Sequence, residues 1–189
     1  KLIGTKNNVS ANGTTSLGIT IGGESNLTTF NESKEVLFYD GSDLIINFTH
    51  NFTNRVLDLS NVTIKKNSSY ILVNFSSQLD ENKTLYLADS SFTELCVKDA
   101  ELNDISEISA DCSSSGEINF TTCIGNNTGV TISGITCTDE GTTIKVENLQ
   151  YSAVRGTTTV STPESTPTPQ QGGGSSGRDV DEVIGDIPV

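Results

Sequence analysis

The sequence contains no Met and no Trp, one His, and only 11 Lys and Arg residues against 24 Asp and Glu residues. Binding to a nucleic-acid backbone requires clustered Lys and Arg, so the formal charge of −13 argues against nucleic acid as a partner. Long apolar runs are also missing. Because no run approaches the roughly 20 residues that cross a bilayer, we expect no membrane insertion of the mature chain, and we expect that an export signal has been removed before Lys1.

Apolar residues make up only 33% of the 189 residues. They gather in short alternating runs, rich in β-branched and aromatic side chains, that are separated by turn-forming Asp, Asn and Gly. About ten such runs predict an all-β fold, an antiparallel β-sandwich, with at most one short helix, near 100–108. The runs lie at 17–21, 35–39, 44–48, 62–64, 70–75, 84–87, 95–97, 118–120, 130–135 and 143–149.

Composition divides the chain into four parts. We expect a flexible N-terminal segment at 1–13 and one sandwich domain at 14–155, with two sub-domains split near residue 65 as the alternative. A long extended linker follows at 156–178, whose only aliphatic residue is Val160, so it cannot pack a core. The last part, 179–189, is rich in Val and Ile and is predicted to be a terminal strand.

Asn-x-Ser/Thr motifs are the strongest single signal. The chain has 12 of them without Pro at the middle position, whereas random placement of the same residues predicts about four. The excess predicts a heavily N-glycosylated protein at the cell surface or outside the cell, with sugars on outer strand faces while Phe48 and Phe75 enter the core. The predicted glycosylation sites are Asn8, Asn12, Asn26, Asn31, Asn47, Asn51, Asn61, Asn67, Asn74, Asn82, Asn119 and Asn126.

The four cysteines fall close together in an otherwise Cys-free chain, at Cys96, Cys112, Cys123 and Cys137. In an exported protein this number predicts two disulfides. Spacings of 16, 11 and 14 residues do not fit the short Cys-x-x-Cys knuckles of zinc sites. Three connectivities are open, of which we favour Cys112–Cys123 closing a hairpin and Cys96–Cys137 tying the flanking strands.

The linker and the terminal strand predict self-assembly. The Ser/Thr/Pro tract at 157–168 is typical of a stalk that carries O-glycans or of an extended linker, and residues 156–177 would reach roughly 70 Å when extended. We interpret the terminal strand as a donor that completes the sheet of a neighbouring copy. The alternatives are the stub of a processed anchor and donation by residues 1–21 instead. The predicted assembly residues are Val180, Val183, Ile184, Ile187 and Val189.

No catalytic constellation is visible. His50 stands between two glycosylation motifs without a local nucleophile, so we expect a solvated surface residue and no enzyme activity. Two acidic pairs, Asp40 with Asp43 and Asp139 with Glu140, lack the EF-hand pattern and are interpreted as turn residues. No metal or cofactor is predicted beyond covalent glycans.

Four segments around the cysteines resemble a module of multi-domain surface proteins from small-genome archaea. They are Cys96-Val97-Lys98-Asp99-Ala100-Glu101; Ile105-Ser106-Glu107-Ile108-Ser109 with Cys112; Cys137-Thr138-Asp139 with Gly141 and Ile144-Lys145-Val146; and Tyr151-Ser152-Ala153-Val154. The resemblance covers about 60 residues. It implies an Ig-like β-sandwich and a location in an envelope or filament, and it implies no active site.

These features together predict a structural subunit of a glycosylated extracellular filament. Copies of the chain would join head-to-tail by donor-strand complementation into a helical homopolymer. The alternative is a cell-surface adhesin or envelope module displayed on the Thr/Pro stalk. A glycoside-active enzyme would need two carboxylates that face a cleft, and the sequence singles out no such pair.

Overall fold

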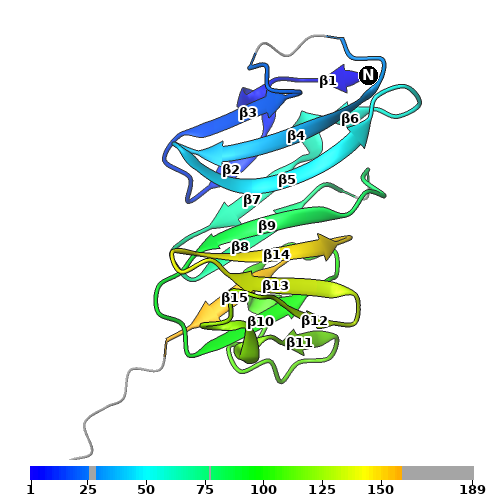
Figure 1. Cartoon of the computed structure of the whole chain (residues 1–189). Helices are drawn as coiled ribbons and strands as arrows, with labels where there is room; N and C mark the ends of the chain where they lie inside the picture. The colour runs from blue at the N-terminus through cyan, green and yellow to red at the C-terminus, as the bar shows by residue number, and fades with distance from the viewer. Residues whose placement is uncertain (26–28, 77, 159–189) are drawn as a thin grey trace, which may run out of the picture. The chain divides into compact units, whose positions relative to one another are not determined.

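The computed structural model describes residues 1–25, 29–76 and 78–158 (Figure 1). Over these ranges the chain is all-β, as predicted, with strands in two main sheets and no α-helix. The predicted donor strand at 179–189, linker residues 159–178 and Asn26 lie outside the described residues. Residues Lys1–Thr159 form one compact unit, and its core continues on both sides of residue 65.

The two main sheets lie one in front of the other as two layers, with the core between them (Figure 1). In spatial order, the seven-stranded sheet consists of β12 (Val130–Ile132), β13 (Ile135–Asp139), β14 (Thr143–Leu149), β9 (Lys83–Ala88), β5 (Asp43–Asn51), β4 (Ser33–Asp40) and β3 (Leu17–Ile21). The six-stranded sheet consists of β11 (Glu117–Asn119), β10 (Glu94–Lys98), β15 (Val154–Thr157), β8 (Tyr70–Asn74), β7 (Thr63–Lys66) and β2 (Ser10–Asn12). A two-stranded sheet pairs β1 (Leu2–Ile3) with β6 (Leu57–Asp58).

Short 3-10 helices occupy several connections: η1 (Lys6–Asn8), η2 (Leu59–Asn61), η3 (Ile105–Glu107) and η4 (Thr121–Cys123). The helix expected near 100–108 is reduced to η3. Asp104 begins this turn, and its side chain accepts a hydrogen bond from the Ser106 backbone N–H at 3.0 Å. Such a cap stabilises a single turn but does not extend it.

Alternation along the strands builds the core between the sheets. On β5, Ile46 and Phe48 face inward and are buried, while Asn47 between them lies on the opposite face. Phe48 meets Phe75 edge to face with ring centroids 5.2 Å apart, and Phe38 lies 6.1 Å from Phe75. The core is therefore one layer of aliphatic side chains around an aromatic cluster.

A second, smaller core lies on the outer face of the six-stranded sheet. Ile71 and Val73 of β8 belong to the main core, whereas Leu72 between them packs with Leu102 and Ile108. The segment 99–115 therefore folds back over the outer side of β8, β15 and β10. Sequence alternation alone would have left that face exposed to water.

The N-terminal residues correct one expectation. We expected a flexible segment at 1–13, but β1 pairs with β6 and β2 pairs with β7, both in parallel. The backbone nitrogen of Lys1 donates hydrogen bonds to the carbonyls of Phe52 at 3.0 Å and Arg55 at 2.7 Å. At the other end, β15 continues to Thr157, so the folded domain extends slightly beyond the expected boundary at residue 155.

A buried ion pair joins the two sheets. Asp40, at the end of β4 and 8% exposed, accepts a 2.6 Å hydrogen bond from Lys66 Nζ on β7. Its other oxygen accepts from the backbone N–H groups of Thr15 and Ser16. Burial raises the pKa of Asp40, but the hydrogen bonds from Lys66, Ser16 and Thr15 outweigh it and hold the pKa well below 3.8.

Asp40→Asn should destabilise the domain by about 2 kcal/mol at pH 7, because it removes the charge that Lys66 and two backbone donors require. The contribution of Asp40 is present above pH 3.8 and is lost as pH falls through the lower pKa of the folded state, so the variant should lack this acid-dependent loss. Urea unfolding at several pH values measures both effects. Asp43→Asn, in the same turn and exposed, is the control and should change stability by less than about 0.5 kcal/mol. Equal stability of Asp40→Asn and wild type would contradict this account.

Candidate functional site

The glycosylation motifs lie on the surface of the domain. Of the described motif residues, Asn47 and Asn51 stand on the outer face of β5, and Phe48 and Phe75 point into the core, as expected. The remaining motif residues occupy turns and strand ends. Every described motif Asn is exposed or half-buried.

Five of these motifs form the same local turn. In each one the Asn side-chain oxygen accepts a hydrogen bond, 2.6 to 3.0 Å long, from the backbone N–H two residues later, where the Ser or Thr stands. This Asx-turn fixes the carboxamide through its oxygen and leaves the amide nitrogen out of the turn. The five residues are Asn51, Asn67, Asn74, Asn119 and Asn126.

Asn74 differs from the other four in its nitrogen. Its Nδ2 donates to the Leu102 carbonyl at 3.1 Å and lies 3.4 Å from Asn103 Oδ1. The side chain therefore ties β8 to the segment that covers the second core. A sugar on this nitrogen would replace one of the two hydrogens that make these contacts.

The disulfides correct the favoured pairing. The structure joins Cys96 to Cys112 and Cys123 to Cys137, with Cα–Cα distances of 5.2 and 5.9 Å. Our pairing was wrong because segment 99–115 folds over β10 and brings Cys112 back to Cys96. Cys123, in η4 directly after β11, instead reaches β13 in the other sheet, so this bridge joins the two sheets.

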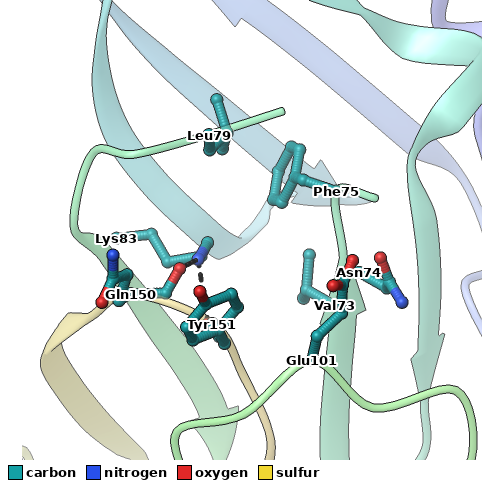
Figure 2. A pocket seen from close by; sticks show the side chains of 8 residues that line it. All are labelled: Val73, Asn74, Phe75, Leu79, Lys83, Glu101, Gln150 and Tyr151. Atoms are coloured by element: carbon teal, nitrogen blue, oxygen red, sulfur yellow. Dashed lines mark hydrogen bonds between the residues drawn. The ribbon is translucent and has the colours of Figure 1, made fainter. Parts of the chain in front are cut away.

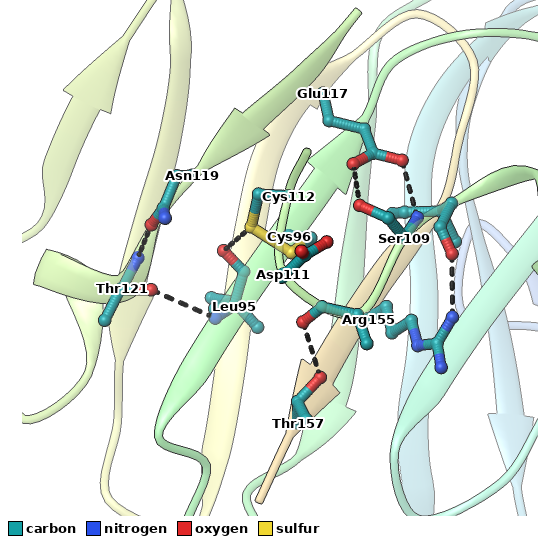
Figure 3. The surroundings of a disulfide bond; sticks show 12 residues. Leu95, Cys96, Ser109, Asp111, Cys112, Glu117, Asn119, Thr121, Arg155 and Thr157 are labelled. Carbon is teal, nitrogen blue, oxygen red and sulfur yellow. Dashed lines mark hydrogen bonds between the residues drawn. A yellow bond between two sulfur atoms is a disulfide. The ribbon is translucent and has the colours of Figure 1, made fainter. Parts of the chain in front are cut away.

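Figure 3 shows how the segment around Cys112 is held in place. The carboxylate of Glu117 accepts hydrogen bonds from the backbone N–H and the hydroxyl of Ser109, and a third from the Ser114 N–H at 3.0 Å. From β15, Arg155 donates to the Ile108 carbonyl at 2.7 Å. The disulfide therefore closes a loop that side-chain hydrogen bonds already order.

The segment 96–101 and the segment 150–154 contact each other directly. Asp99 accepts hydrogen bonds from the backbone N–H groups of Gln150 at 3.2 Å and Tyr151 at 2.5 Å. The Lys98 N–H donates to the Ala153 carbonyl at 3.0 Å. These contacts join the end of β10 to the loop before β15.

A buried lysine, Lys83, lines the small cavity in Figure 2. Lys83, 3% exposed, donates to the carbonyls of Gln150 and Tyr151, the latter at 2.9 Å, and its Nζ lies 5.7 Å from the centre of the Phe75 ring. Burial lowers its pKa to about 8, against the opposing charges of Asp99 and Glu81. The cavity has a volume of about 10 Å³, room for about one water molecule. Lys83 therefore acts as a link between β9 and the loop before β15.

His50 contradicts the prediction of a solvated surface residue, since it is fully buried. It is the last inward-facing residue of β5, and its ring meets Phe52 edge to face at 4.6 Å. Its Nδ1 lies 3.3 Å from Glu81 Oε1, without the alignment of a hydrogen bond, and Nε2 has no partner among the described residues. Burial lowers the pKa of His50, and the neighbouring Glu81 only partly opposes this.

Of the two acidic pairs, Asp139 and Asp43 lie at turns as predicted, whereas Asp40 is the buried partner of Lys66 described above. Asp139 accepts hydrogen bonds from the N–H groups of Gly125 and Gly141, both at 2.7 Å, and so fixes two turns. Asp43 is exposed beside Ser42. Among the described residues, no group of three or more His, Cys, Asp or Glu side chains is placed to hold a metal ion. The described part of the chain also has no helix long and apolar enough to span a membrane.

Comparison of the chain with protein-family models, with curated proteins and with solved structures finds no match.

Substitution of His50 by Phe should make the stability of the domain less dependent on pH below 6.5. In wild type, the unfolded chain binds a proton at His50 near pH 6.5 while the buried ring resists it, so stability falls as pH drops below 6.5. Thermal unfolding between pH 7.5 and 4.5 tests this, with wild type and the variant measured side by side. Parallel pH curves for the two proteins would contradict the burial of a neutral His50.

Proposed function

We propose that this chain is a structural subunit of a glycosylated extracellular filament whose copies join head-to-tail by β-strand addition. The observation that carries the proposal is the open architecture of the sandwich. In the described residues both main sheets end in edge strands, β3 and β12 in one and β2 and β11 in the other. An open edge presents unpaired backbone groups that a strand from another copy can complete.

The proposed donor is the terminal segment 179–189, with Val180, Val183, Ile184, Ile187 and Val189 as the residues that enter the neighbouring domain. The linker before it is long enough to cross a domain of this size. A donor on such a tether forms a heterologous contact, which repeats into an open fibre rather than closing into a ring. The proposed partners are therefore further copies of the same chain.

Three features support a location outside the cell. The two disulfides are compatible with an oxidising compartment such as the cell exterior. The 12 glycosylation motifs point the same way, since a motif excess of this size has no use in a compartment without glycosylation. The archaeal resemblance agrees with a place in an envelope or filament.

A surface module on a stalk is the second candidate, and the Ser/Thr/Pro tract at 157–168 favours it. In that role the domain would be displayed as a monomer and the terminal segment would have no partner. The two functions differ in the state of the purified native protein, which is fibrous in the first and monomeric in the second. Electron microscopy separates them directly.

Deletion of residues 179–189 should abolish fibres and leave folded monomers or amorphous aggregates. Full-length protein and the truncated chain are compared by negative-stain electron microscopy and light scattering at equal concentration. A matched control deletes Gly172–Gly177, which shortens the tether but keeps the donor, and should still form fibres. If fibres persist after removal of the C-terminal segment, strand donation by residues 179–189 is wrong.

Glycan occupancy should be lowest at Asn74 and high at Asn119, because both form an Asx-turn but only Asn74 has its nitrogen bonded within the fold. Mass spectrometry of glycopeptides from native protein measures the occupied fraction at each site. The matched pair shares the motif Asn-Phe-Ser/Thr, so local sequence differs little. An occupied Asn74 beside an unmodified Asn119 would contradict the assignment.

A further inference from the structure

At one edge of the seven-stranded sheet, the register of β3 against β4 determines which backbone groups of β3 are left without a partner. The Gly22 N–H donates to the Glu35 carbonyl at 2.8 Å, in line with the pairing of β3 and β4. Hydrogen-bonded pairs alternate along antiparallel strands, so the even-numbered residues of β3 bond to β4. The odd-numbered residues direct their N–H and C=O groups away from β4.

The open part of this edge is short and well defined. Ile21 uses its outward groups to exchange hydrogen bonds with Glu24, at 2.9 and 3.2 Å. Leu17 and Ile19 keep their outward N–H and C=O groups without a backbone partner among the described residues. These two residues therefore offer four backbone groups to an added strand.

One apolar side chain of this edge strand is incompletely covered. Ile19 is 5% exposed, but Leu17 at the start of β3 packs against the main core while remaining half-buried. A strand placed along β3 would bury more of the Leu17 side chain with its own inward side chains. The edge thus combines free hydrogen-bonding groups with a partly exposed apolar residue.

Charge distinguishes this end of the sandwich from the other end. Residues 1–25, which include β2, β3 and the residue Glu24 that bonds to Ile21, contain Lys1 and Lys6 and only this one acidic residue. Residues 99–144, which include β11 and β12, contain acidic residues and no Lys or Arg. The terminal segment 179–189 carries four acidic residues and no basic one. Its negative charge is therefore attracted to the end of the domain that holds β2 and β3 and repelled by the end that holds β11 and β12.

We propose that the free edge of β3 is the acceptor for residues 179–189 of a neighbouring copy. This assignment rests on the proposed function, since it names the site at which the donor acts. The chain leaves each domain after β15, an inner strand that stands between β10 and β8 in the six-stranded sheet, whereas β3 is an edge strand of the other sheet. Donor exit and acceptor edge are therefore different sites on the domain, as a head-to-tail fibre requires.

Amide hydrogen exchange on the full-length protein tests the assignment without any change at the acceptor. The comparison is between assembled wild type and a full-length chain in which the five assembly residues are Ser, which should stay monomeric. Assembly should slow exchange at Leu17 and Ile19 at least tenfold, because their amides gain partners. The amides of Gly18 and Thr20 already bond to β4 and serve as internal controls.

A pair of proline variants tests the same edge by function. Leu17→Pro removes an outward N–H that the domain does not use, so folding should persist while fibre formation falls at least tenfold. Thr131→Pro is the control on β12, the edge strand at the other end of the same sheet. The two-residue turn at Ser133 and Gly134 sets the register, so the Thr131 N–H points away from β13. This variant should leave fibres intact. Thermal unfolding of each variant shows whether the domain remains folded.

The outcomes separate this inference from the proposed function. Fibres with protected Leu17 and Ile19 support both. Fibres in which these amides stay unprotected, or in which Thr131 gains protection instead, overturn the acceptor assignment but leave the filament role standing. If the native full-length chain forms no fibres, the proposed function fails and the acceptor site fails with it.

Discussion

The fold is stabilised mainly by a single layer of apolar side chains between the two sheets. With one third of its residues apolar, the chain can cover the inner faces of its sheets but not both faces. The outer face of β5 is accordingly polar and carries glycosylation motifs. Where an outer face is covered, over β8, β15 and β10, the cover is a loop that needs the Cys96–Cys112 bridge and the Glu117 hydrogen bonds to stay in place.

Three polar side chains are buried in this thin core. Asp40, Lys83 and His50 differ in how many hydrogen-bond partners they have. Asp40 and Lys83 make several hydrogen bonds and act as links between elements. His50 has only Glu81 nearby, and its burial is tolerated because the neutral ring also packs against Phe52. Hydrogen bonds from buried polar groups therefore add links between elements that the thin apolar layer alone does not provide.

Sequence reasoning succeeded where local periodicity decides the structure. Residues 17–21 coincide with β3, and the runs in β4, β5, β9 and β14 were found because each alternates between core and solvent. It failed where distant segments meet. The parallel pairing of β2 with β7, and the disulfide partners of Cys112 and Cys123, depend on how loops cross the sheets, which spacing along the chain does not encode. His50 was placed on the surface because its polar neighbours hid the inward direction that it shares with Phe48.

The sequence predicted which kinds of functional feature to expect, but it did not predict where on the fold a donor strand would bind. The excess of glycosylation motifs and the Val- and Ile-rich terminus are visible in composition, whereas the proposed acceptor edge follows only from the hydrogen-bond register of β3. A helical reconstruction of the native material by cryo-electron microscopy tests the account most directly. It should show an additional strand along β3, at Leu17 and Ile19, that continues through a tether into the preceding copy. A fibre in which β3 remains an uncovered edge, or native material made only of monomers, would contradict the account.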